Sequence, residues 1–151
     1  METVTDTFFI RKIYVETHDI YGAALRLMDS LSPFGTPSVS ENAFETDGPR
    51  KRVRIAGEMK TDFDNHSSLL FIVKISGESG SGLGFLEVHV TSVFQMVFPL
   101  PEGLVYGTFV DYYAMHMAKT HKDRSKSLTH AMFDVLYKSA KTIKDEAEEY
   151  S

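Results

Sequence analysis

The chain contains no cysteine, and it has no long apolar run. It therefore has no disulfide framework, no thiolate metal site and no thiol nucleophile. A membrane-crossing helix needs roughly 20 consecutive apolar residues, and no stretch approaches that length. Met1–Asp6 is polar and acidic, without the basic and apolar regions of a signal peptide. We expect a cytoplasmic protein without a transmembrane segment.

An excess of positive charge is also missing. The net charge is −5 and the pI is about 5.6, which argues against a general polyanion binder, because phosphate neutralisation supplies most non-specific affinity for nucleic acid. Neither basic cluster has the interleaved aromatic residues typical of RNA-binding surfaces, so we expect no nucleic-acid partner. We interpret both as solvated charge, with peripheral contact to a phosphate or lipid headgroup as an alternative for the second. The clusters are Arg50, Lys51, Arg52, Arg54 and Lys119, Lys122, Arg124, Lys126.

The 151 residues, of which 42% are apolar and 25% charged, fit one soluble domain over residues 1–151. Its most informative stretch is Ser125–Glu149, where apolar residues recur at steps of three and four. This spacing predicts one amphipathic helix, roughly 37 Å long. We expect Lys119–Lys126 to be a basic connection into it. The apolar positions are Leu128, Met132, Val135, Leu136, Ala140 and Ile143.

The middle of the chain alternates apolar and polar residues, which is typical of half-solvated strands. We predict strands over Thr7–Glu16, Arg52–Lys60, Leu69–Ser76 and Phe85–Phe98, with a weak strand through Phe44. The last of these is much longer than a typical strand, which predicts a bent strand in a curled sheet. Gly77–Gly84 is expected to be a hairpin loop. A short helix is expected from Asp19 to Leu31, with Asp19 as its N-cap and Pro33 after its end.

Leu104–Met117 fits two structures. The run from Phe109 to Tyr113 is rich in residues that favour strands, and we favour a strand here. A helix is the alternative, because Val105, Phe109, Tyr113 and Met117 also form a stripe at i, i+4.

The order of these elements resembles the helix-grip fold of the START-like (SRPBCC) superfamily. The likeness is strongest to the branch of small proteins related to carbon monoxide dehydrogenase and to archaeal START-like proteins of unknown function. It rests on the first strand and its helix, on the strand Val53-Arg54-Ile55-Ala56-Gly57-Glu58, and on the glycine-rich hairpin Gly77-Glu78-Ser79-Gly80-Ser81-Gly82. The fold class predicted is α+β, with a curved antiparallel sheet wrapped around a long C-terminal helix.

The resemblance implies a hydrophobic or amphipathic small-molecule ligand in a cavity between the sheet and the final helix. Such pockets are mostly apolar. A filled core is the alternative use of the same side chains. The expected lining is Leu69, Phe71, Val73, Val88, Val90, Phe94, Met132 and Leu136.

Two other functions stay open. A second resemblance is to the export chaperone SecB, through Phe8–Tyr14 and the long hairpin, which implies binding of unfolded chains. A cyclase or hydratase of the START-like superfamily would need a polar group in the cavity, such as Asp111 or Tyr113. We lean away from an enzyme, because no catalytic constellation is evident, and the oligomeric state is not indicated.

The six histidines show no metal-ligand spacing, so we expect no metal and no cofactor, and we assign the histidines to the surface. Glu87 and His89 share one strand face, and we expect that face to point to solvent. Asp62, Asp64 and Asn65 begin like a calcium loop, but the residues that follow do not continue it. This stretch is predicted to be a turn.

Overall fold

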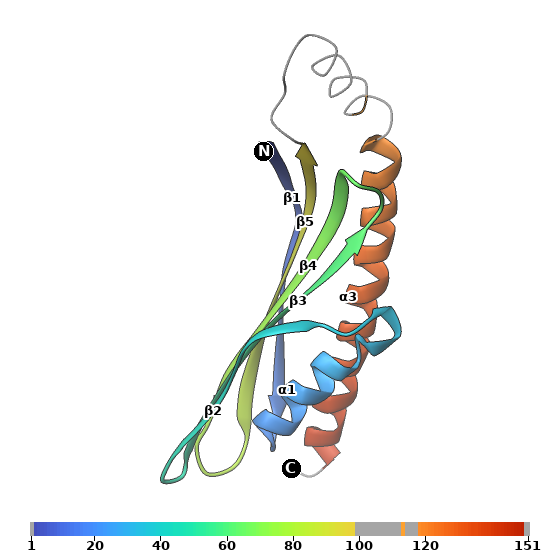
Figure 1. Cartoon of the computed structure of the whole chain (residues 1–151). Helices are drawn as coiled ribbons and strands as arrows, with labels where there is room; N and C mark the ends of the chain where they lie inside the picture. The colour runs from blue at the N-terminus through green and yellow to red at the C-terminus, as the bar shows by residue number, and fades with distance from the viewer. Residues whose placement is uncertain (1, 99–112, 114–117, 150–151) are drawn as a thin grey trace.

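One curved antiparallel sheet and two helices on its inner face make up the described part of the fold. The computed structural model describes residues 2–98, 113 and 118–149. Its five strands lie in the order β1-β5-β4-β3-β2, so the first strand pairs with the last (Figure 1). The strands are β1 (Glu2–Thr17), β2 (Ser38–Asp47), β3 (Arg50–Asp62), β4 (Ser67–Ser79) and β5 (Gly84–Phe98).

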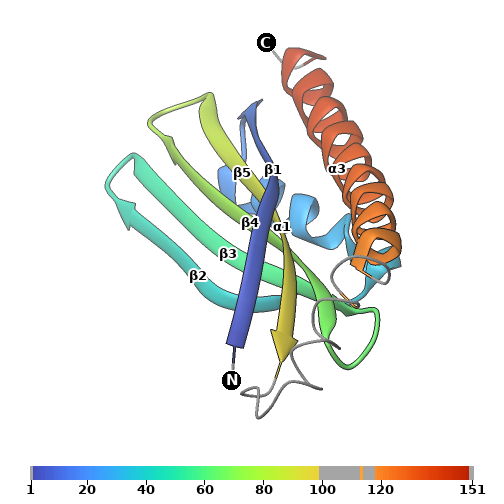
Figure 2. The same ribbon diagram turned by 90° about the horizontal axis from the view of Figure 1, so that it is seen from above.

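The sheet is curved, and register shifts in its two edge strands contribute to the bend. β1 shifts its pairing with β5 between Thr7 and Phe9, and β2 shifts against β3 between Val39 and Glu41. Such bulges bend a strand and increase its twist. Figure 2 shows the resulting curl from above. The predicted fold class, an α+β fold with a curved antiparallel sheet against a long C-terminal helix, is confirmed.

The alternating strands bury one face and expose the other. On β3, β4 and β5 the predicted apolar rows face inward. For β1 the sequence did not decide between the faces. Its inward side chains are Phe9, Ile13 and Val15, whereas Ile10 and Tyr14 are 61% and 67% exposed on the outer face.

The first helix is α1 (Ile20–Asp29), and its start was predicted correctly. The Asp19 side chain accepts a hydrogen bond of 3.0 Å from the backbone N–H of Gly22, which satisfies one free donor of the first turn. A short 3₁₀ turn, η1 (Ser32–Phe34), follows where Pro33 prevents continuation. α1 packs against β3, β4 and β5, and it also contacts the C-terminal helix.

The C-terminal helix, α3 (Ala118–Glu149), is 32 residues long. It lies along the sheet, chiefly over β1 (Figures 1 and 2). The prediction of a connection over Lys119–Lys126 was wrong, because the helix already includes these residues. No apolar period indicates a helix here, since the inward positions of these early turns are polar. Of the predicted strand Leu104–Met117, only Tyr113 belongs to the described residues.

The loop predicted for Gly77–Gly84 is shorter in the structure, because β4 continues to Ser79. Gly77 is needed at its place in the strand. A Cβ atom there would lie 2.3 Å from the backbone oxygen of Phe85 and 2.6 Å from Leu86 Cδ2. A backbone atom cannot move aside as the end of a flexible side chain can.

We predict that Gly77→Ala destabilises the protein by about 1–3 kcal/mol, because the added methyl group overpacks the β4–β5 contact. Urea unfolding followed by circular dichroism measures the change. Gly80→Ala is the matched control, since a Cβ atom at Gly80 meets nothing within 4 Å. Equal stability of the two variants would contradict this explanation.

Candidate functional site

The eight side chains predicted to line a cavity lie between the sheet and α3. Each is at most 2% exposed. Seven belong to the main apolar cluster, which also includes inward residues of β1, β3 and α1. Phe94 lies in a second, smaller cluster with Met96 and Tyr113. Phe8 and Phe63 pack against both clusters.

The inward face of α3 changes character along the helix. Its buried positions follow each other at steps of three and four residues, as one face of a helix requires. The first two are polar and the remaining ones are apolar. In order they are Ser125, Thr129, Met132, Leu136, Ala140, Ile143 and Ala147.

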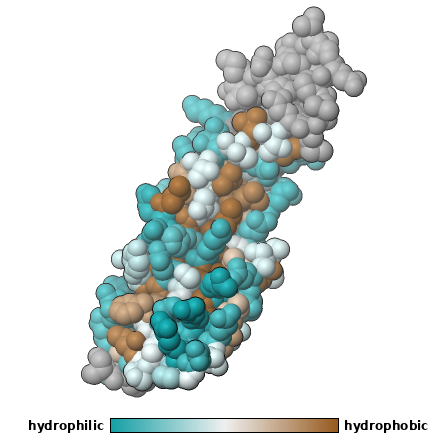
Figure 3. Space-filling view, turned by 90° about the vertical axis from the view of Figure 1, so that its left-hand side faces the viewer, coloured by the Kyte–Doolittle hydropathy of each residue, from teal (hydrophilic) through white to brown (hydrophobic). Residues whose placement is uncertain are grey.

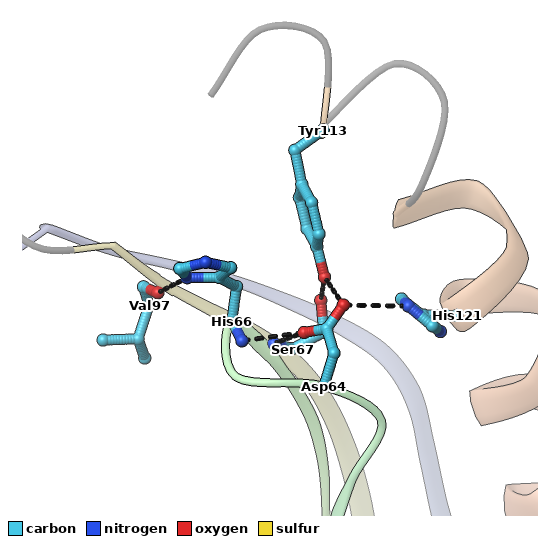
Figure 4. A network of polar contacts seen from close by, with 6 residues as sticks. All are labelled: Asp64, His66, Ser67, Val97, Tyr113 and His121. Atoms are coloured by element: carbon cyan, nitrogen blue, oxygen red, sulfur yellow. Dashed lines mark hydrogen bonds and ion pairs between the residues drawn. The ribbon is translucent and has the colours of Figure 1, made fainter. Parts of the chain in front are cut away.

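A polar network lies at the end of the sheet where β3 turns into β4, and Asp64 is its centre (Figure 4). Asp64 Oδ1 accepts the backbone N–H groups of His66 and Ser67, both at 2.7 Å. Its Oδ2 accepts the Tyr113 hydroxyl at 2.5 Å, and His121 Nε2 lies 3.0 Å from the same oxygen. One carboxylate therefore connects the turn, Tyr113 and the start of α3.

Ser67 completes the contact with Tyr113. The Ser67 and Tyr113 hydroxyl groups form a short hydrogen bond in a buried place. Since the single proton of Tyr113 goes to Asp64, Ser67 is the donor in this pair. His66 Nδ1 lies 3.2 Å from the carbonyl oxygen of Val97, which joins the turn to the end of β5.

The network fixes the charge states of Asp64 and Tyr113. Burial acts to raise the pKa of Asp64, but its hydrogen bonds from Tyr113 and from two backbone N–H groups, with the attraction to His121, lower it overall. Burial, together with the bond to Asp64, raises the pKa of Tyr113 to about 12. At neutral pH Asp64 is therefore an anion and Tyr113 a neutral donor.

His121 is held in one orientation. Its ring stacks on Phe63, with 5.5 Å between the ring centroids and 9° between the planes. Only 13% of its side chain is exposed, so the surface position predicted for His121 was wrong. Within the described residues, two buried side-chain atoms have no hydrogen-bond partner, His121 Nδ1 and Ser125 Oγ. They lie one helical turn apart on α3.

One turn further along α3, a buried hydrogen bond crosses to the sheet. Thr129 Oγ1 donates to Ser92 Oγ of β5 at 3.0 Å, and both residues are fully buried. We call His121, Ser125, Thr129 and Ser92 the polar seam. It runs between α3 and the sheet.

The second basic cluster contributes aromatic contacts beside this site. Lys122 pairs with Asp6 at 3.3 Å, and its ammonium group lies 5.8 Å from the centre of the Phe94 ring. Arg124 lies over the ring of Phe63 at 5.4 Å. In the first cluster, Arg52 and Arg54 form cross-strand pairs with Glu78 and Glu41.

Two open hollows lie near these features. One of about 630 Å³ adjoins the start of α3, and Phe63, Arg124 and Leu128 are among its lining residues. The other, of about 660 Å³, lies on the outer face of the sheet beside Tyr14 and Phe85. Figure 3 shows that apolar side chains gather along the middle of this outer face, among polar ones.

The other predicted groups lie apart from the network. His89 Nε2 is 2.7 Å from Glu87 Oε1, and the pair lies on the outer face as predicted. Asp111 is outside the described residues. The described part of the chain brings no group of three or more His, Asp or Glu side chains together for a metal ion. None of its helices combines the length and apolar character that crossing a membrane requires.

Asp64 is the residue that sequence reasoning missed. It was placed correctly in a turn, but nothing indicated its contacts with Tyr113 and His121, which lie 49 and 57 positions away in sequence. An Asp followed at two positions by a turn residue is a signal for an Asx turn. That signal explains only the two backbone hydrogen bonds.

No family model matches the chain, and no curated protein matches it. The function is therefore inferred from the contacts of the site.

We predict that Asp64→Asn destabilises the fold by about 1–3 kcal/mol at pH 7, because the hydrogen bonds to a charged acceptor are weakened. The pKa of Asp64 is lower in the folded than in the unfolded state. Its stabilising effect is thus fully present above the unfolded pKa and is lost as the pH falls through about 4 and below.

Urea unfolding of both proteins between pH 3 and pH 7 measures this difference. Asp62→Asn is the control, since Asp62 is 69% exposed and its only ion pair, with Lys60, is 3.7 Å long among the described contacts. A difference between wild type and Asp64→Asn that stays constant with pH would contradict the assigned role.

Proposed function

We propose that this protein binds a hydrophobic or amphipathic small molecule between the inner face of the sheet and α3. The observation that carries the proposal is the pair of buried polar atoms, His121 Nδ1 and Ser125 Oγ, without partners in the described part of the chain. Leaving a buried polar atom unpaired costs about 1–3 kcal/mol. Two such atoms one turn apart, on a helix face that otherwise covers an apolar core, are typical of a binding site.

The apolar surroundings support the same proposal. The polar seam lies where the main apolar cluster meets the smaller one around Phe94 and Met96. A ligand with an apolar body and a polar end would find both characters there. The hollow beside Phe63 and Leu128 gives a route to this place from the surface.

Entry of a ligand would require α3 to separate from the sheet. The polar seam favours separation at the N-terminal part of the helix, because the contact there is polar and includes the single Thr129–Ser92 bond. Further along, Met132, Leu136 and Ile143 hold the helix through apolar burial, which is proportional to the area removed from water. We therefore place the site at the first three turns of α3.

An enzymatic function has less support. Proton transfer is efficient when the pKa of the catalytic group lies near the working pH. The pKa of Tyr113 is raised to about 12 and that of Asp64 is lowered below its ordinary value, so both shifts lead away from neutrality. Their arrangement favours holding a structure in place over cyclase or hydratase chemistry.

Binding of unfolded chains, as the SecB resemblance implies, is the second candidate. It is supported by the outer face of the sheet, where Ile10, Tyr14 and Phe85 are 61%, 67% and 57% exposed. Exposed aromatic residues beside arginines, here Arg52 and Arg54 at the hollow, are frequent in protein-binding surfaces.

A pair of variants on β5 distinguishes the two candidates. Val90 is fully buried on the inner face, and Thr91 is its neighbour on the outer face. We predict that Val90→Phe abolishes uptake of the neutral apolar dye Nile red, because the larger side chain fills the site. Thr91→Phe should retain the uptake.

Dye fluorescence is titrated for both variants after circular dichroism has established that they are folded. Uptake that survives in Val90→Phe but is lost in Thr91→Phe would assign binding to the outer face, in favour of the chaperone-like candidate.

A further inference from the structure

His121 presents one hydrogen-bond acceptor in a fixed direction. Nε2 faces the Asp64 carboxylate, which can only accept, so Nε2 carries the proton. In the neutral imidazole, Nδ1 is then left with a lone pair. The bond to Asp64 and the stacking on Phe63 together determine where that lone pair points.

Ser125 adds a hydroxyl group on the same face of α3. Residues four apart on a helix have Cβ atoms about 6 Å apart, which leaves room for one atom between their side chains. Ser125 is fully buried, and its Oγ has no hydrogen-bond partner among the described residues. Its hydroxyl can donate one hydrogen bond and accept others.

Together these two groups match a ligand hydroxyl. We infer that the site between His121 Nδ1 and Ser125 Oγ binds the hydroxyl end of a neutral amphipathic alcohol, which donates to Nδ1 and accepts from Ser125. This inference rests on the proposed function, since it identifies the polar part of the same ligand. An ether or ester oxygen could accept from Ser125 but could not donate to Nδ1.

The charges nearby disfavour an acidic ligand. Asp64 is an anion bonded to the same histidine, and a ligand carboxylate would bring a second negative charge to the other side of the ring. The cations in this stretch have other contacts: Lys122 pairs with Asp6, and Arg124 lies over Phe63. A carboxylate also lacks the proton that Nδ1 requires.

The surroundings indicate where the apolar part of the ligand lies. Deeper along the polar seam, the Thr129–Ser92 bond is already satisfied, and Met132 follows it. Toward the surface, Phe63 contacts His121 and also lines the hollow with Leu128. A chain attached to the bound hydroxyl therefore leads along Phe63 toward this hollow.

Competition against Nile red at pH 7.5 tests the inference with three probes that share a ten-carbon chain: 1-decanol, its methyl ether and sodium decanoate. We expect 1-decanol to displace the dye at a concentration about tenfold lower than either of the others, as loss of one buried hydrogen bond implies. Ser125→Ala and His121→Phe should reduce this preference to about threefold or less while still binding the dye.

The controls match each substitution on the same helix. Ser139→Ala and His130→Phe change residues that lie outside the polar seam, and both should keep the full preference for the alcohol. A readout that needs no variant is the ¹⁵N chemical shift of His121 Nδ1 in the wild-type protein. It should move upfield when 1-decanol is added and stay unchanged with the ether.

The outcomes separate the inference from the proposed function. If Nile red binds but the ether or decanoate competes as well as 1-decanol, or if Ser125→Ala keeps the preference, the hydroxyl site is wrong and the binding function stands. If neither Nile red nor any probe binds the wild-type protein, the proposed function fails, and the inference fails with it.

Discussion

The structure depends on burying one face of a long helix against a sheet that alternates between apolar and polar residues. α3 cannot bury its stripe on itself, and the sheet has only one apolar row per strand to offer. Curvature brings those rows toward the helix, and α1 fills the remaining part of the same face. The pairing of β1 with β5 places the first strand beneath α3, so the two ends of the chain hold each other.

Asp64 fixes one end of this arrangement. The carboxylate organises the β3–β4 turn through two backbone N–H groups and then reaches Tyr113 and α3. A saturated carboxylate holds the imidazole of His121 in one tautomer, which is how a structural contact gives the neighbouring site its chemical preference. Stability and binding are thus coupled at this one residue.

The sequence predicted the strands, α1 and the apolar half of α3, because each has a clear period of two or of 3.6 residues. It did not predict the first turns of α3, where the inward positions His121, Ser125 and Thr129 are polar and leave no apolar period to detect. Gly77 was assigned to a loop because glycine is common in turns, yet here it allows two strands to approach closely. The Asp64 network joins residues distant in sequence, which no local pattern reveals. Thus the features that sequence reasoning missed lie mainly at the candidate site.

The position of the ligand is the central claim, and it can be measured directly. Isotope-filtered NMR on the protein with bound 1-decanol reports which methyl groups lie near the alkyl chain. We predict nuclear Overhauser effects from the ligand to Leu128 and to the inward methyl groups of Met132 and Val90, all near α3. Contacts confined to Ile10 and Ile72 would place the ligand on the outer face of the sheet and contradict a site beneath the helix.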